Sequence, residues 1–98
     1  MHHAGHAVDP ATSAVTPPIN LSTTYARQTD GTEHTGFLYS RYTNPNRAAL
    51  ESCLAALESG TIAAALSSGS AATMTLLQAI GPAHVILPDD AYFGSIKL

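Results

Sequence analysis

Apolar positions follow a helical period in one segment of the chain, between Asn44 and Gly60. The apolar stripe consists of Leu50, Cys53, Leu54 and Leu57, at positions i, i+3, i+4 and i+7. Asn44 is a good helix N-cap, and Pro45 suits the first helical position, where a missing N–H costs nothing. Gly60 is typical of the residue just beyond a helix. The pattern predicts a helix from Asn44 that stops at Gly60.

Two short, continuously apolar runs come later, at residues 62–66 and 84–87. Between them lie a serine- and glycine-rich turn at Ser67–Ser70, an apolar helical stretch at 71–80, and Gly81-Pro82, which ends it. Strand, turn, helix and strand in this order are typical of α/β proteins. Runs without alternation indicate a sheet buried on both faces. The pattern leaves open whether the two strands are adjacent or antiparallel.

The first part of the chain is more polar. Residues 1–18 are histidine-rich and end in Pro17-Pro18, which forbids a regular helix, so they are expected to form an arm. Residues 26–37 have the composition of a loop. His2, His3 and His6 could bind a metal, but no nearby cysteine or acid completes a site, and a solvated tail is the alternative. No metal is assigned.

Composition narrows the class of protein. The net charge is −3, only 11% of the 98 residues are charged, and there are four Lys and Arg residues, which argues against a nucleic-acid surface. So few charges also suggest that other protein covers much of this surface. No apolar run approaches the roughly 18 residues of a membrane span. Cys53 is the only cysteine and lies in the apolar stripe, so we expect a packing role and a reducing, cytoplasmic location.

Two places in the sequence suit a phosphate. Ser68-Gly69-Ser70 opens a predicted helix, where backbone amides are unsatisfied and Gly69 permits close approach, although such a sequence is often only a cap. Tyr39 and Arg41 lie two positions apart, so on an extended segment both point to one side. A surface aromatic beside a solvated arginine is the alternative. Together the two features suggest a phosphorylated cofactor.

Tyr92 follows a predicted strand and the acidic pair Asp89-Asp90, a position where loops build ligand sites, or where a tyrosine simply packs. Adjacent acids rarely form a catalytic pair, so a capping or bracing role is expected for both. Lys97 is the only lysine. We assign it no catalytic role.

The order and spacing of several motifs resemble the N-terminal part of the Cys/Met-metabolism family of pyridoxal-phosphate enzymes. The matching segments are Pro17–Ile19, Ser22–Tyr25, Tyr39–Arg41, Asn44-Pro45, Leu50-Glu51, Leu57–Gly60, Ser68–Ala72 and Asp89–Ser95. The resemblance implies an α/β protein of fold-type I, similar to aspartate aminotransferase. Residues 1–43 would be an extended arm and loop contacting a neighbouring subunit, and residues 44–98 the incomplete first part of the large cofactor-binding domain.

The resemblance also implies roles for residues toward pyridoxal 5'-phosphate. The amides of Gly69 and Ser70 would bind its phosphate, while Tyr39 and Arg41 would reach the phosphate in the neighbouring subunit. Tyr92 would stack on the pyridine ring and assist proton transfer as the catalytic residue. The family more often has Met or Leu in place of Ser70, which an amide contact tolerates. It usually has glycine in place of Phe93, so the local geometry of that loop differs.

The implied activity is elimination or replacement at the γ carbon of a sulfur amino acid or an activated homoserine, as in cystathionine γ-synthase or γ-lyase, by a homotetramer built as a dimer of dimers. Two alternatives stay open, namely the O-acylhomoserine sulfhydrylase or cystathionine β-lyase branch, and a non-catalytic α/β fragment that binds a phosphate or a partner subunit. Family members are about four times longer. Their Schiff-base lysine, pyridine-nitrogen aspartate and substrate-carboxylate arginine match nothing here, so the 98 residues alone should be inactive.

Overall fold

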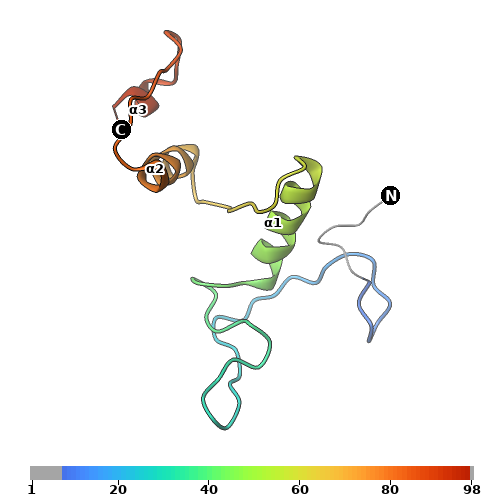
Figure 1. The fold of residues 1–98 in the computed structure, drawn as a ribbon. Helices are drawn as coiled ribbons and strands as arrows, with labels where there is room; N and C mark the ends of the chain where they lie inside the picture. Colours follow the sequence, from blue (N-terminus) through green and yellow to red (C-terminus); the bar gives the residue numbers. More distant parts are fainter. Residues whose placement is uncertain (1–7, 98) are drawn as a thin grey trace. The chain divides into compact units, whose positions relative to one another are not determined.

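The computed structural model describes residues 8–97, in which three helices follow one another along the chain. They are α1 (Pro45–Leu57), α2 (Gly69–Ile80) and α3 (Phe93–Ile96), labelled in Figure 1. The chain divides into two compact units between Ala64 and Ala65. The first unit contains α1, and the second contains α2 and α3, which contact each other.

Helix α1 begins as its sequence predicts. The Asn44 side chain accepts hydrogen bonds from the amides of Asn46 and Arg47, and Pro45 occupies the first helical position. The predicted end at Gly60 is wrong, because α1 ends at Leu57 and Ser59 takes the left-handed conformation, with φ of 55°. The Gly60 amide instead donates to the carbonyl of Ala55 at 2.8 Å. This bond is the longer closing bond of a Schellman motif, so Gly60 lies one position beyond the left-handed residue.

Helix α2 ends at Ile80 as predicted, and it begins at Gly69, two residues before the predicted stretch of 71–80. The Ser68 hydroxyl accepts a hydrogen bond from the Ala71 amide at 3.1 Å, which caps the first turn. Gly81 ends the helix with φ of 76°, a conformation that favours glycine. The short helix α3 has no counterpart among the sequence predictions, which treat residues 92–95 as a loop.

The two predicted strands, at 62–66 and 84–87, are absent. Among residues 8–97 the structure has only two isolated bridges, Thr24 with Tyr39 and Arg27 with Glu33, both antiparallel. A strand satisfies its backbone groups through a neighbouring strand, and neither β-bridge of the described chain involves an apolar run. The helical half of the α/β prediction is therefore observed here, and the sheet is not.

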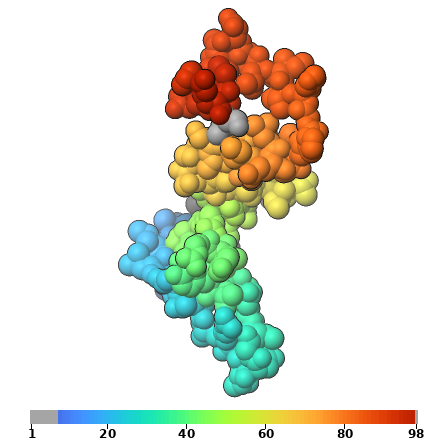
Figure 2. All heavy atoms as spheres, turned by 90° about the vertical axis from the view of Figure 1, so that its left-hand side faces the viewer, coloured from blue at the N-terminus to red at the C-terminus, as the bar shows by residue number. Residues whose placement is uncertain are grey.

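The first unit has a long loop. Residues 27–37 extend away from α1 (Figure 1), and the space-filling view shows the same segment as a projection of this unit (Figure 2). At its base the Ser40 amide donates to the Thr23 carbonyl at 2.8 Å, and the Tyr25 amide to the Leu38 carbonyl at 3.1 Å. Tyr25 and Phe37 also pack ring to ring at 5.6 Å. The loop is thus closed where it joins the Tyr39–Arg41 segment.

None of the described residues is fully buried, so the described part of the chain has no closed hydrophobic core. The predicted apolar stripe on α1 is largely exposed, with Leu57 at 73%, and Ile62 and Ile86 are exposed at 86% and 96%. Exposed apolar area of this kind is typical of surfaces that pack against further protein. No helix among the described residues combines the length and apolar character that crossing a membrane requires.

Candidate functional site

The Tyr39–Arg41 segment forms a turn, so the prediction of an extended segment is wrong. The Tyr39 carbonyl accepts hydrogen bonds from the amides of Tyr42 and Thr43, both at 2.9 Å. The turn nevertheless brings the predicted pair together, because the Arg41 guanidinium carbon lies 4.9 Å from the Tyr39 ring centroid. Tyr42 lies on the same cation at 5.6 Å and meets Tyr39 edge to face. The result is an exposed cation beside a phenol.

Arg47 on α1 is hydrogen-bonded to the backbone of this turn. Its Nη1 donates to the Ser40 carbonyl at 3.4 Å, and its Nη2 donates to the Tyr42 carbonyl. Its Nε lies 3.9 Å from a carboxylate oxygen of Glu51, one turn further along the helix. Sequence patterns give no sign of this role, because it depends on the turn lying against α1.

Asn46, the preceding residue, ties the N-terminal arm to the same end of α1. Its side-chain oxygen accepts from the Asn20 amide at 2.8 Å, and its side-chain nitrogen donates to the Pro18 carbonyl at 2.7 Å. A primary amide can pair in this way with one donor and one acceptor of an extended backbone. The first turn of α1 therefore organises both the arm and the Tyr39–Arg41 turn.

The N-terminus of α2 carries the second phosphate-directed feature. Within the described part of the chain, the amides of Gly69 and Ser70 have no hydrogen-bond acceptor, because the Ser68 side chain caps Ala71 instead. A Cβ placed on Gly69 would meet no atom within 4 Å. Two free amides at the positive end of a 12-residue helix, with open space beside them, fit an anion such as a phosphate.

Tyr92 lies immediately before α3 and is 73% exposed. Its ring lies against Gly94, where an added Cβ would come within 3.0 Å of Cζ and 3.1 Å of Cδ1. Only glycine leaves room for this ring position. Lys97 places its ammonium 5.4 Å from the Phe93 ring centroid, a cation–π contact.

Among residues 8–97, two carboxylates have a shifted pKa, and both lie in the first unit. The hydroxyl and then the amide of Thr32 hold the pKa of Asp30 below its ordinary value. The amides of Thr12 and Ala11 do the same for the pKa of Asp9. Both acids stabilise turns and lie outside the predicted site.

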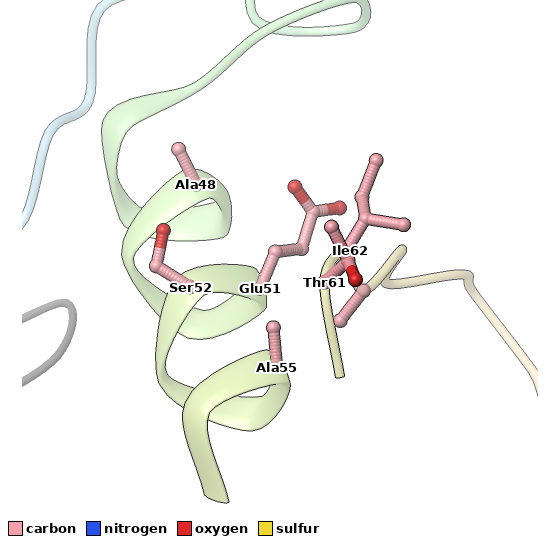
Figure 3. A pocket seen from close by; sticks show the side chains of 7 residues that line it. Ala48, Glu51, Ser52, Ala55, Thr61 and Ile62 are labelled. Carbon is pink, nitrogen blue, oxygen red and sulfur yellow. The ribbon is translucent and has the colours of Figure 1, made fainter. Parts of the chain in front are cut away.

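Two hollows in the first unit do not coincide with the predicted site. One, of about 260 Å³, lies between α1 and residues 61–63, and the Glu51 carboxylate projects from α1 toward residues 61–62 (Figure 3). The other, of about 320 Å³, lies beside Pro17, Leu50 and Cys53. Neither is lined by Tyr39, Arg41 or a residue of the second unit.

No cluster of metal-ligating side chains occurs among residues 8–97. The three N-terminal histidines considered in the sequence, His2, His3 and His6, lie outside the described residues. The predicted cofactor residues form two groups. Tyr39 and Arg41 belong to the first unit, and Gly69, Ser70 and Tyr92 belong to the second.

Both groups are suited to a phosphorylated ligand, one through a side-chain cation and phenol and the other through helix amides. Comparison with known proteins defines the class further. The model of the family "Cys/Met metabolism PLP-dependent enzyme" matches residues 1–98, and the chain belongs to this family. The predicted family and its cofactor, pyridoxal 5'-phosphate, are therefore confirmed.

The curated relatives include enzymes with different names. The chain is 52% identical to cystathionine gamma-synthase of Mycobacterium tuberculosis over 98% of its own length and 25% of that protein. It is 48% identical to cystathionine beta-lyase of Coxiella burnetii, again over 98% of its own length and 25% of the relative. The chain thus spans about a quarter of the length of the curated relatives it matches.

A solved structure of a gamma lyase also matches this chain. The crystal structure of the gamma lyase CalE6 from Micromonospora echinospora matches with a TM-score of 0.81 and 41% identity, over 97% of this chain and 25% of that one. This similarity is consistent with the predicted fold-type I architecture. The described residues supply helices of that architecture, while its sheet is not formed among them.

Proposed function

We propose that this chain is the N-terminal segment of a pyridoxal-phosphate enzyme of sulfur amino-acid metabolism. The reaction is γ-elimination or γ-replacement, as in cystathionine γ-synthase or γ-lyase, on a sulfur amino acid or an activated homoserine. The observation that carries the proposal is the N-terminus of α2, where Gly69 and Ser70 present two amides without an acceptor in the described chain. Membership of the family supplies the identity of the anion.

The residues of this chain then have separate tasks. The amides of Gly69 and Ser70 hold the cofactor phosphate of their own subunit, without needing a particular side chain at position 70. Arg41 and the Tyr39 phenol hold the phosphate of the neighbouring subunit through charge-assisted hydrogen bonds. When bound, pyridoxal phosphate supplies an electron sink for the substrate carbanion.

Tyr92 is the proposed catalytic residue. Its exposed ring is available to lie against the face of the cofactor ring, which orients it. Its phenol then accepts or donates a proton at the phenolic oxygen during turnover. Gly94 supports this role because it leaves room for the ring.

We further propose that the complete protein is a cytoplasmic homo-oligomer, a dimer of dimers, in which residues 1–43 contact the neighbour and residues 44–98 begin the cofactor-binding domain. The exposed apolar side chains of α1 and α2 support it, since Leu57 and Leu76 are 73% and 61% exposed in the isolated chain. A second candidate is the β-lyase branch, because the chain is also 48% identical to the cystathionine beta-lyase of Coxiella burnetii. Products distinguish the two, because β-elimination from cystathionine gives pyruvate and γ-elimination gives 2-oxobutyrate.

Subunit complementation in the complete enzyme tests the crossing of Tyr39 and Arg41. Arg41→Ala should weaken cofactor binding by about 1.5–3 kcal/mol, or roughly 10- to 150-fold, because a charge-assisted contact is lost. Mixing Arg41→Ala with a variant that lacks the Schiff-base lysine should restore activity. After exchange, one site of the hybrid interface has both groups intact.

The exposed Arg27 provides a matched control, because Arg27→Ala removes the same charge from the loop. That variant alone should behave as the parent enzyme does. The assay uses a cofactor concentration that loads the parent enzyme but not Arg41→Ala. If confirmed hybrids there never exceed the summed activity of the two variants, Arg41 does not serve the neighbouring site.

A further inference from the structure

We infer that Arg47 is a positioning residue for the phosphate-binding pair, fixing the backbone on both sides of Arg41. The inference rests on the proposed function of Tyr39 and Arg41. Arg47 itself does not touch the cofactor. It acts through the shape of the turn that carries the two ligands.

The hydrogen bonds of Arg47 carry the inference. Its Nη1 donates to the carbonyl of Ser40 at 3.4 Å, and its Nη2 donates to the carbonyl of Tyr42. These carbonyls belong to the residues immediately before and after Arg41. One planar guanidinium therefore restrains the Ser40–Arg41 peptide, which leads into Arg41, and the Tyr42–Thr43 peptide, one residue beyond it. A lysine ammonium lacks the fork geometry for two such acceptors.

Arg47 is itself held at both ends. The side chain of Asn44 accepts a hydrogen bond from its amide at 3.2 Å, which fixes its backbone in the first turn of α1. The Glu51 carboxylate lies 3.9 Å from its Nε, at the i, i+4 spacing of helix neighbours. The Arg47 side chain is 32% exposed and that of Glu51 is 27% exposed. Through Arg47 the turn is thus attached to the first turn of a regular helix.

The two arginines differ in what remains available to a ligand. Arg47 directs its guanidinium to backbone carbonyls and to a carboxylate. Arg41 is exposed, and its guanidinium lies on the faces of Tyr39 and Tyr42 at 4.9 and 5.6 Å. Stacking leaves the N–H groups at the edge of a guanidinium free to meet an anion. Arg41 is therefore the ligand, and Arg47 keeps it in place.

The test uses the complete apoenzyme, titrated with pyridoxal 5'-phosphate and, separately, with pyridoxal, which lacks the phosphate. Arg47→Gln should raise the dissociation constant for pyridoxal phosphate about tenfold. The reason is that Arg41 is no longer held in place and its charge-assisted contact to the phosphate is lost. The constant for pyridoxal should stay within about twofold, since no phosphate contact is involved. Arg47→Lys, which keeps the charge, should have an intermediate effect. Arg27→Ala should leave both constants unchanged.

Two further measurements separate positioning from general stability. Hydrogen exchange at the amides of Tyr42 and Thr43 should be faster in Arg47→Gln apoenzyme, because both amides close the turn. Adding Arg47→Gln to Arg41→Ala should cause little further loss of cofactor affinity, since both act through one contact.

Equal loss of affinity for pyridoxal phosphate and pyridoxal overturns the inference, and so does unchanged exchange at Tyr42 and Thr43. If Arg41→Ala weakens cofactor binding while Arg47→Gln and Arg47→Lys do not, the inference alone fails. If Arg41→Ala also leaves pyridoxal phosphate affinity unchanged, the proposed phosphate role of Arg41 fails, and the positioning role falls with it.

Discussion

The two units of the chain are held together by different kinds of contact. In the first unit, the Asn46 side chain forms hydrogen bonds with Asn20 and Pro18, which lie 26 and 28 positions away in the sequence. A β-bridge also joins Thr24 to Tyr39. In the second, the hydrogen bonds described for residues 68–97 reach at most four positions, as from Thr73 to Gly69. The described hydrogen bonds of the first unit thus include distant partners, whereas those of residues 68–97 join near neighbours in the sequence.

The same difference separates the two proposed phosphate contacts. Arg41 and Tyr39 are presented by a turn that needs Thr23, Tyr25 and Arg47. Gly69 and Ser70 are presented by the start of a helix that needs its own cap. A substitution in the first unit should therefore act at a distance, and one in the second should act where it is made.

The largest expected effect is at the end of α2. Gly81 has φ of 76° and ψ of −160°, a region that is almost exclusive to glycine, so Gly81→Ala should lower the free energy of unfolding by roughly 1–3 kcal/mol. Gly60→Ala is the control at the end of α1, because the new Cβ lies 3.7 Å from its nearest neighbours. Denaturant unfolding of the complete protein should show almost no change for the control. Equal losses would mean that glycine is needed at both helix ends.

The next effect contrasts Asn46→Ala with Ser68→Ala. Asn46→Ala removes two hydrogen bonds and should cost about 1–2 kcal/mol. Ser68→Ala removes one cap and should cost about 1 kcal/mol. Hydrogen exchange should locate the changes, at the Asn20 amide for the first variant and at the Ala71 amide for the second. Faster exchange beyond the first turn of α2 in Ser68→Ala would contradict the local character of the second unit.

The smallest effect is a pH dependence in the loop of residues 27–37. Because the folded pKa of Asp30 is below its ordinary value of 3.8, its carboxylate stabilises the loop above that pH. The contribution is lost as the pH falls through the folded pKa. Thr32→Val removes the hydroxyl that contributes most, so the pKa of Asp30 should rise toward 3.8 in a carboxyl chemical-shift titration.

Asp9 is the internal control for this titration. Its pKa is lowered mainly by the Thr12 amide, so Thr32→Val should leave it unchanged. A parallel rise at both acids would show that the substitution disturbs the whole unit.

Features that depend on residues close together in the sequence could be predicted from the sequence alone. Asn44 and Ser68 cap the helices as predicted, and Gly81 ends α2, because capping involves residues only a few positions apart. The predicted end of α1 is wrong because a Schellman motif needs a residue in the left-handed conformation, and that residue is usually glycine. Ser59 takes that conformation in place of Gly60.

Features that depend on distant partners could not be predicted in this way. The apolar runs at 62–66 and 84–87 match the pattern of strands, but a strand also needs a neighbour, and apolar character does not supply one. The turn at Tyr39 and the roles of Asn46 and Arg47 depend on which backbone segments approach α1. The assignment of Tyr39, Arg41, Gly69, Ser70 and Tyr92 to the cofactor came from the family resemblance, and it stays a prediction.

The free amides at the start of α2 have a consequence for mutational tolerance. Every residue type except proline supplies a main-chain N–H donor, so almost any substitution keeps it. Drift at Ser70 can therefore change the side chain freely while the phosphate contact persists. At Arg41 even a change to lysine loses the planar fork. Random mutagenesis of a cofactor-dependent reporter should consequently recover many different residues at position 70 and almost none at position 41.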